Sequence, residues 1–368
     1  MRWCLELTPD IWTRAASPDQ GIRRSIEVVR QAEALGFDSV WLSEDPDGWD
    51  AFATLTVLAR ETRLIRLGTG VTNPYLRHPN LIAASVSTLD WASGGRAFLG
   101  LGRGQAEWYG EAFGMDVGRQ LERVRSTVDL LRQWWGPSHE ATGDGEVIVR
   151  GWRRSFGPIA RPPVYLAATG SKTLALAGEV ADGVRINELA SVAYLTQAIA
   201  TFKDAARAVG RDPEALRVVY HPSIVLVGTE EERDAALERK KATVALIHAL
   251  PGMDRQLETA GFDVPAIMAE VRSAMRTEEI LAAGGGFPEM RGRGDLAAAK
   301  RAIPAELMAR VALVGTLDEV RRRVAELAEI GVTDLFFDLD RPHDPADLRA
   351  LLDGCAGLET KGRNGAFP

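Results

Sequence analysis

Short apolar runs alternate with amphipathic segments along most of the chain. The runs are short enough to be strands, and the amphipathic segments carry apolar residues at helical spacing. The predicted strands cover residues 3–7, 39–42, 65–68, 97–101, 164–167, 183–187, 217–227 and 334–339. The predicted helices cover residues 18–35, 51–60, 81–92, 121–135, 172–180, 192–209 and 317–330. A doubly wound sheet would also alternate in this way, but eight strands in series favour a closed α/β architecture, the (β/α)8 TIM barrel.

Residues 229–304 interrupt this rhythm. The segment begins as a helical pattern and becomes Gly-rich at 284–286 and 291–294. We interpret it as an insertion after strand seven, near the barrel mouth, within a single domain that covers residues 1–368. A mobile lid is one interpretation; a helical decoration or a dimer contact is another. A smaller insertion with a hairpin around 146–149 is predicted within 134–163, and the tail 361–368 is expected to fray.

Composition places the 368-residue chain among soluble globular proteins, with 46% hydrophobic and 26% charged residues. The net charge of -7 and the lack of a long basic run argue against nucleic acid as a partner. Because no apolar run reaches the length of a membrane span and the N-terminus does not resemble a signal peptide, we expect a cytoplasmic protein without a membrane partner. Cys4 and Cys355 are then expected to be reduced, although a disulfide between them is possible in principle.

The loop Gly68–Tyr75 follows the third predicted strand, where a barrel would expose it at its mouth. Its glycines permit close approach of the backbone to a flat ligand. Thr72 and Asn73 supply side-chain donors and acceptors. The alternative is a simple turn that ends the strand. The Gly-rich segment Gly100–Gln105, after strand four, lets a ring system lie against the backbone in the same way.

The segment Ala167–Lys172 leads directly from a strand into a helix. The free amides at a helix start, together with the Thr169 and Ser171 hydroxyls, form an anion site that suits a phosphate. Alternatively, one of these hydroxyls only caps the helix.

Two candidates for an acid or base lie near the predicted mouth, an acidic segment and a histidine. Ser43–Asp47 places three carboxylates after strand two, and their repulsion can raise one pKa; a solvated acidic loop is the alternative. His78 precedes a helix and is either an acid–base group or a histidine that hydrogen-bonds the loop. We find no zinc motif, P-loop or G-x-S-x-G elbow, and therefore predict no metal site.

Five segments together resemble the bacterial luciferase-like superfamily, above all its branch that uses coenzyme F420, typified by methylenetetrahydromethanopterin reductase. They are residues 34–45, 65–79, 88–104, 164–184 and 313–337, and they occur in the order typical of the family. The resemblance implies a TIM barrel whose mouth binds a flavin or deazaflavin, a cis peptide between Gly70 and Val71 behind the ring, and a homodimer.

The same resemblance assigns roles to individual residues. Asn73 and Glu44 would hydrogen-bond the ring, Arg103 and Gly104 would line the ribityl side, and the segment after strand five would hold the phosphate. The full predicted cofactor set is Glu44, Gly70, Val71, Asn73, Arg103, Gly104, Ala168, Thr169, Gly170, Ser171, Thr173, Gly183 and Val184.

The chain also departs from its F420-dependent sugar-phosphate dehydrogenase relatives. It has Glu44-Asp45 where they have Asp-His, and Gln105 where they have an acid. The base that alcohol oxidation needs is therefore missing or replaced by Asp45. Our leading hypothesis is hydride transfer between F420 and a small organic substrate, reducing a C=C, C=N or C=O bond, with Asp45 as the acid or base and Glu44 or His78 as substitutes.

Two other functions stay open on the sequence. One is a two-component monooxygenase that uses reduced FMN and O2, because the same barrel serves both cofactors. The other is a non-catalytic binding protein, because a fold does not determine a function. Trp12, Trp49 and Trp108 lie near predicted strand ends and suggest a large, partly apolar pocket, although core or interface packing explains them equally well.

Overall fold

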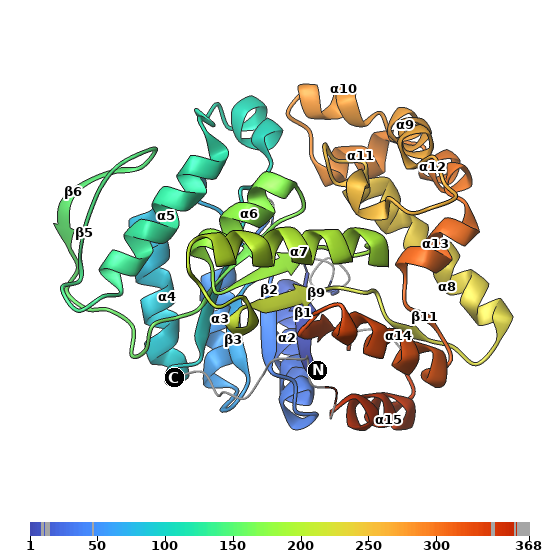
Figure 1. The fold of residues 1–368 in the computed structure, drawn as a ribbon, viewed down its shortest axis with the longest axis horizontal. Coiled ribbons are helices and arrows are strands. Elements are labelled where there is room, and N and C mark those ends of the chain that lie inside the picture. The colour runs from blue at the N-terminus through green and yellow to red at the C-terminus, as the bar shows by residue number, and fades with distance from the viewer. Residues whose placement is uncertain (9–10, 12–14, 46–47, 340–342, 357, 359–368) are drawn as a thin grey trace.

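Eight parallel strands close into a barrel in this computed structural model, which describes residues 1–8, 11, 15–45, 48–339, 343–356 and 358 (Figure 1). Around the barrel they follow one another as β1 (Arg2–Leu7), β12 (Asp334–Phe336), β9 (Arg217–Tyr220), β8 (Gly183–Ile186), β7 (Val164–Ala167), β4 (Ala97–Leu101), β3 (Arg66–Thr69) and β2 (Ser39–Leu42). The predicted TIM barrel is confirmed. Trp12 and the tail 361–368 lie outside the described residues.

Helices cover the outside of the barrel, and local capping explains where several begin. Ser17 accepts a hydrogen bond from the amide of Gln20 at 3.3 Å, and Thr316 forms a capping box with Glu319. The barrel helices are α2 (Pro18–Ala34), α3 (Ala51–Arg60), α4 (Pro79–Ser93), α5 (Gln120–Trp134), α6 (Ser171–Val180), α7 (Val192–Ala208), α14 (Leu317–Glu329) and α15 (Pro345–Cys355).

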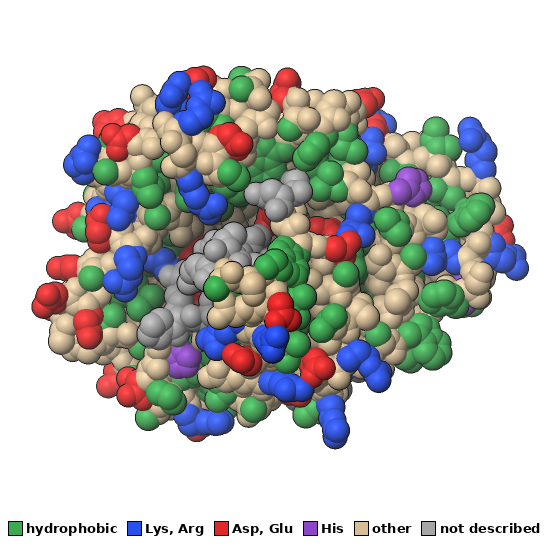
Figure 2. Space-filling view, turned by 180° about the vertical axis from the view of Figure 1, so that it is seen from behind, with side chains coloured by type: hydrophobic (Ala, Val, Ile, Leu, Met, Phe, Trp, Pro, Cys, Tyr) green, Lys and Arg blue, Asp and Glu red, His purple; other side chains and the backbone are tan. Residues whose placement is uncertain are grey.

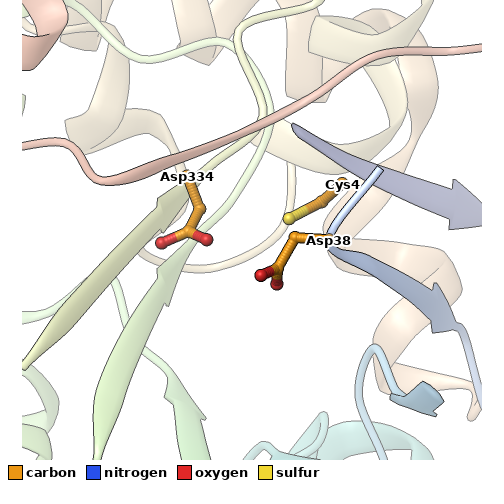
Figure 3. Close-up of side chains that lie close together, drawn as sticks. All are labelled: Cys4, Asp38 and Asp334. Carbon is orange, nitrogen blue, oxygen red and sulfur yellow. The ribbon is translucent and has the colours of Figure 1, made fainter. Parts of the chain in front are cut away.

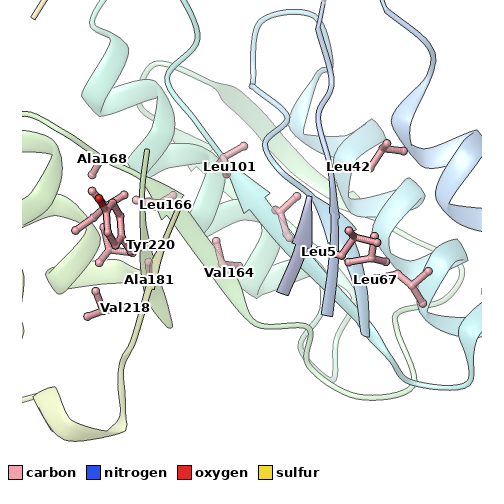
Figure 4. Packing of buried hydrophobic residues seen from close by; sticks show 14 of the residues in the cluster. Leu5, Leu42, Leu67, Leu101, Val164, Leu166, Ala168, Ala181, Val218 and Tyr220 are labelled. Atoms are coloured by element: carbon pink, nitrogen blue, oxygen red, sulfur yellow. The ribbon is translucent and has the colours of Figure 1, made fainter. Parts of the chain in front are cut away.

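Successive side chains of each strand point alternately outward and inward. Both faces are buried, because helices cover the outside and side chains fill the inside. Outward-facing residues such as Leu5, Leu67 and Val164 belong to the apolar cluster between barrel and helices (Figure 4). A second cluster fills the barrel interior, where the ring of Trp41 lies 4.5 Å from that of Phe98 between centroids. Its members are Cys4, Trp41, Phe98, Tyr165, Val219 and Phe336.

An ionic layer closes the amino-terminal end of the barrel. The side chains of Cys4, Asp38 and Asp334 point toward one another there, with ligand atoms within 4.8 Å, a spacing that also suits a metal ion (Figure 3). The Arg217 guanidinium donates to Asp334 and, at 2.9 Å, to Asp38, while Arg2 donates to Asp334 at 3.2 Å. These cations balance the carboxylates, so we assign the layer a structural role. Burial raises the pKa of Cys4 to about 11, which keeps it a thiol.

The predicted seventh strand, residues 217–227, is two strands in the structure. β9 ends at Tyr220, and β10 (Val225–Leu226) pairs instead with β11 (Val314–Gly315). Between β10 and β11 the chain forms a helical body on one side of the molecule, yellow to orange in Figure 1. Its helices are α8 (Glu230–Thr243), α9 (Val264–Met275), α10 (Thr277–Ala282), α11 (Phe287–Arg293), α12 (Leu296–Ala302) and α13 (Ala305–Val311).

This helical body, residues 227–313, has an apolar cluster of its own. Met268, Met275 and Leu307 are fully buried in it. The second Gly-rich stretch is helical, since α11 covers 291–293, whereas Gly284 takes a left-handed turn with a φ of 73° before that helix. The cluster explains the amphipathic pattern of this segment: its apolar faces pack mainly against one another, and also against Leu189 in the loop after β8.

The smaller insertion forms the predicted hairpin, with β5 (Glu140–Asp144) antiparallel to β6 (Ile148–Arg153).

Cys4 and Cys355 are both buried free thiols. Side chains of both charges are intermixed on the face shown in Figure 2. Within the part of the chain that the structure describes, no helix has the length and apolarity that crossing a membrane requires.

Candidate active site

A cavity of about 610 Å³ opens at the carboxyl ends of the strands. Its walls come from the bulge after β3, the loops after β4 and β7, the end of β8 and the helical body. The lining residues are Val71, Gly102–Gln105, Gln120, Leu121, Ala167–Thr173, Arg185, Asn187, Pro251–Met253 and Arg255. The predicted residues Val71, Arg103, Gly104, Ala168, Thr169, Gly170, Ser171 and Thr173 are among them.

The bulge after β3 forms one wall, and the peptide bond between Gly70 and Val71 is cis, as the resemblance predicts. Hydrogen bonds on both sides hold the bulge against β4. The Thr72 amide donates to the Gly100 carbonyl at 3.0 Å, and the Gly102 amide donates to the Thr72 carbonyl at 2.8 Å. The backbone of this wall is therefore fixed, and Val71 presents its side chain to the cavity.

The start of α6, after β7, forms another wall. Gly170 is the N-cap, and within the described residues no side chain caps the helix, so the Thr169 and Ser171 hydroxyls do not play that role. The uncapped amides and the helix dipole favour an anion here. Arg255, from the helical body, brings its Nη1 to 3.5 Å from the position that a Cβ on Gly170 would occupy. Together with Lys172, this arrangement suits a phosphate.

The loop after β4 also lines the cavity. A Cβ on Gly102 would lie 2.8 Å from the Val71 side chain, and one on Gly104 would lie 2.2 Å from the Tyr109 ring. Glycine is required at both positions for the two loops to come this close. Arg103 is held in place because its Nη1 donates to Gln120 Oε1 at 2.8 Å.

Glu44 and Asn73 do not line the cavity; they support the bulge from behind. The Glu44 carboxylate accepts from the Thr72 hydroxyl and, at 2.7 Å, from Arg77 Nε. Asn73 is buried, and its Oδ1 accepts the amides of Tyr75 and Leu76 at 3.0 Å each. These contacts hold the bulge in its shape.

The three predicted acid–base residues are not among the residues that line the cavity, and each has different surroundings. His78 is exposed and caps α4, because its Nδ1 accepts the Asn80 amide at 3.2 Å. The Glu44 carboxylate accepts hydrogen bonds from Thr72 and Arg77. Asp45 is partly exposed and lies near Tyr109, where burial first and then the Asp45 and Glu44 carboxylates raise the pKa of the tyrosine.

Gly183 and Val184 lie away from the cavity. Gly183 begins β8 at the amino-terminal end of the barrel, where a Cβ would meet the Arg217 carbonyl oxygen at 2.6 Å and the Tyr165 ring. Val184 points outward and is fully buried in the cluster beneath the helices. Gly183 allows close packing inside the barrel and Val184 packs outside it, so we do not include them in the site.

The sequence reasoning missed several groups at the mouth. Arg185, two residues after Gly183 on β8, lines the cavity and pairs with Glu6 of β1. The segment 251–255 of the helical body also lines it. The sequence did contain a signal for Arg185: it is the one charged residue in the apolar strand β8, and a buried charge needs either an ion-pair partner or a ligand. Trp49 packs against the main apolar cluster, whereas Trp108 packs edge-on against Phe287, with centroids 5.2 Å apart.

A closed α/β barrel whose mouth holds a cavity between a Gly-rich bulge and a free helix start has the architecture of a cofactor-binding barrel enzyme. The family model described as luciferase-like monooxygenase matches residues 1–334, and the chain belongs to this bacterial luciferase-like family.

The chain is similar to one of the following three proteins in sequence and to the other two in fold. The 5,10-methylenetetrahydromethanopterin reductase of Methanolobus tindarius is 31% identical over 319 residues, covering 86% of this chain and 90% of the relative. The coenzyme F420-dependent tetrahydromethanopterin reductase from Methanopyrus kandleri superposes with a TM-score of 0.69, at 23% identity, over 97% of this chain and 98% of that one. The FMN-bound oxygenating constituent of 3,6-diketocamphane monooxygenase from Pseudomonas putida, 17% identical, superposes with a TM-score of 0.64 over 100% of both chains.

Proposed function

We propose that this chain is an oxidoreductase that transfers hydride between coenzyme F420 and a small organic substrate, reducing a C=C, C=N or C=O bond. One observation carries the proposal: Val71 of the cis bulge and Gly170 of the uncapped helix start line the same cavity. A phosphorylated ring cofactor needs these two features at its two ends. The naming of similar enzymes as methylenetetrahydromethanopterin reductases favours F420 over FMN.

The residues of the cavity fit such a cofactor. The uncapped amides of α6, with Arg255 and Lys172, would hold the phosphate. Gly102 and Gly104 line the cavity with backbone only, because Val71 and Tyr109 already fill the space that a side chain at either position would need. When bound, F420 supplies a ring carbon that carries the hydride, and the protein supplies orientation and charge.

The protein's own part in the reaction is to place the ring and to provide a proton. Val71 and the Gly-rich loop after β4 form part of the cavity wall. A reduction also consumes one proton for each hydride. Asp45, which follows β2 outside the cavity lining and lies near Tyr109, is our proposed proton donor. Glu44 is the weaker alternative because Arg77 and Thr72 already occupy its oxygens.

A titration with both cofactors tests the proposal. The purified protein is mixed with increasing F420 or FMN, in oxidised and reduced forms, and binding is followed by fluorescence. We expect saturable F420 binding that is at least about tenfold tighter than FMN binding. Tighter binding of reduced FMN, with O2 consumed on substrate addition, would support a monooxygenase instead. Affinity for neither cofactor would revive a non-catalytic role. A homodimer in the cytoplasm remains our expectation, and the mass of the purified protein in solution tests its first part.

A further inference from the structure

Arg185 is a buried cation in the wall of the cavity. It is only 7% exposed, and its place on β8 is opposite Ala167 on β7, the residue that leads into the loop at the start of α6. Both residues line the cavity. Arg185 therefore stands on the side of the cavity where the proposed phosphate site begins.

The Arg185 guanidinium is held from behind. It pairs with Glu6, although β9 and β12 separate their strands, so the two side chains meet inside the barrel mouth. It also lies over the Phe336 ring, 5.5 Å from the centroid. Its Nε is buried and has no hydrogen-bond partner among the described residues. The guanidinium is thus fixed in place with part of its donor capacity unused.

A compact set of charges surrounds Glu6. His221 Nε2 lies 3.6 Å from Glu6 and 3.3 Å from Asp338, and its ring stacks on Phe336. Lys240 lies 2.8 Å from Glu188 and 3.9 Å from Asp338. The set contains three carboxylates, Glu6, Glu188 and Asp338, and two fixed cations, Arg185 and Lys240, together with His221. Burial alone would lower the pKa of His221. The carboxylates of Asp338, Glu188 and Glu6 outweigh burial and raise that pKa, because they stabilise the protonated imidazolium.

We propose that Arg185 contacts the pyrimidine edge of the bound deazaflavin ring and favours the anionic form of that ring, with Glu6 as the counter-charge that positions it. This inference rests on the proposed use of F420. It extends that proposal because it assigns a charge-setting contact to a residue outside the family-derived set of cofactor contacts.

The chemistry of the ring supports this placement. The ribityl chain leaves the ring beside the N1–C2 carbonyl edge, so an Arg on the phosphate side of the cavity meets that edge. F420 carries a phenolic hydroxyl at the far end of the ring, and conjugation spreads the charge of its anion to the same N1–C2 edge. A cation there stabilises the anion and lowers the pKa of the hydroxyl.

The absorbance of bound, oxidised F420 reports this pKa directly. The protein is saturated with F420, and the spectrum is recorded across the pH range of the hydroxyl. In Arg185→Gln we expect the pKa of the bound chromophore to rise by about one unit relative to the wild type. Arg185→Lys, which keeps the charge, should restore most of the shift. Glu6→Gln removes the counter-charge and should move the pKa in the opposite direction, which lost packing would not do.

Arg255→Gln is the matched control, because it removes the same charge from the phosphate end of the same cavity. We expect weaker F420 binding and an unchanged chromophore pKa. If Arg185→Gln does not fold, Glu6→Gln/Arg185→Gln replaces the buried pair with two neutral amides and gives the same readout. An unchanged pKa in the Arg185 variants, or an equal shift in Arg255→Gln, would overturn this inference alone. Failure of the wild type to bind F420 would overturn the proposed function as well.

Discussion

The ammonium of Lys240 lies 2.8 Å from the carboxylate of Glu188, and this contact joins helix α8 to the loop that follows β8. Lys240 is 3% exposed, and its ammonium also donates to Ser223 Oγ at 2.6 Å. The Glu188 carbonyl accepts from His248 Nε2 at 3.0 Å. The helical body is therefore attached to the barrel mouth through buried polar contacts as well as apolar ones.

Removing one partner of the Lys240–Glu188 ion pair should lower the stability of the fold. In Lys240→Met we expect the free energy of unfolding at pH 7 to fall by about 3 kcal/mol, because the Glu188 carboxylate, whose side chain is only 21% exposed, loses its cation. Urea unfolding measures the change. Lys300→Met is the control, since Lys300 pairs with Glu238, whose side chain is 53% exposed, and should cost less than about 0.5 kcal/mol. A similar small loss for both variants would contradict our view of the pair. Lys240→Met/Glu188→Gln should recover part of the lost stability.

The same pair predicts a pH dependence of stability. Burial alone would raise the pKa of Glu188, but Lys240 and His221 outweigh it and hold that pKa at about 2, below the ordinary value of 4.5. A group with a depressed folded-state pKa stabilises the protein fully above its unfolded value and loses that contribution as the pH falls toward its folded value. Unfolding of the wild type between pH 5 and 2 should show this loss, and Glu188→Gln should lose less stability over that window. Parallel curves for the two proteins would argue against the depressed pKa.

Asp45→Asn separates catalysis from cofactor binding. If Asp45 supplies the proton, turnover at saturating cofactor should fall by about 10²–10⁴-fold. The dissociation constant for F420 should change far less, because Asp45 does not line the cavity. Steady-state rates and the fluorescence titration measure the two quantities. Undiminished turnover in the variant would remove Asp45 from the mechanism.

Gly100 is required for the close contact of β4 with the bulge. A Cβ there would lie 2.1 Å from the Thr69 carbonyl oxygen, and backbone cannot move aside as a flexible side chain can. We expect Gly100→Ala to lower the free energy of unfolding by about 2–3 kcal/mol and to weaken F420 binding. Gly292→Ala, in α11 with open space around the new Cβ, should be neutral or slightly stabilising. Thermal unfolding of both variants distinguishes these outcomes, and equal melting temperatures would refute the prediction.

Much of the fold was predictable because it depends on local pattern. Each barrel strand is a short apolar run, and helix starts such as Ser17 and Thr316 carry their capping signals in adjacent residues. The cis peptide at Gly70 followed from family resemblance and not from local pattern. The predicted seventh strand was too long, because β10 finds its partner in β11, far away in the sequence.

The candidate site was predictable only where its residues are contiguous. The segment Ala167–Thr173 could be recognised as an anion site from its own residues. Arg185 and Glu6 are 179 residues apart and meet only when the barrel closes. Arg255 reaches the cavity from a helical body whose packing has no short-range signal. Gly183 and Val184 were wrongly predicted as cofactor residues because they lie close to the site in sequence. In the structure Gly183 lies at the other end of the barrel, and Val184 points to its outside.

The pairing of β10 with β11 has an evolutionary consequence. Val225 lies beside Val314 and Leu226 beside Gly315, so the polypeptide leaves the barrel and returns to it at neighbouring points. Because its two ends lie side by side, the whole intervening stretch can be exchanged for another without displacing the eight-stranded barrel. Because that stretch also reaches the cavity, each exchange would bring a new wall for the substrate together with a new Arg255 or its replacement.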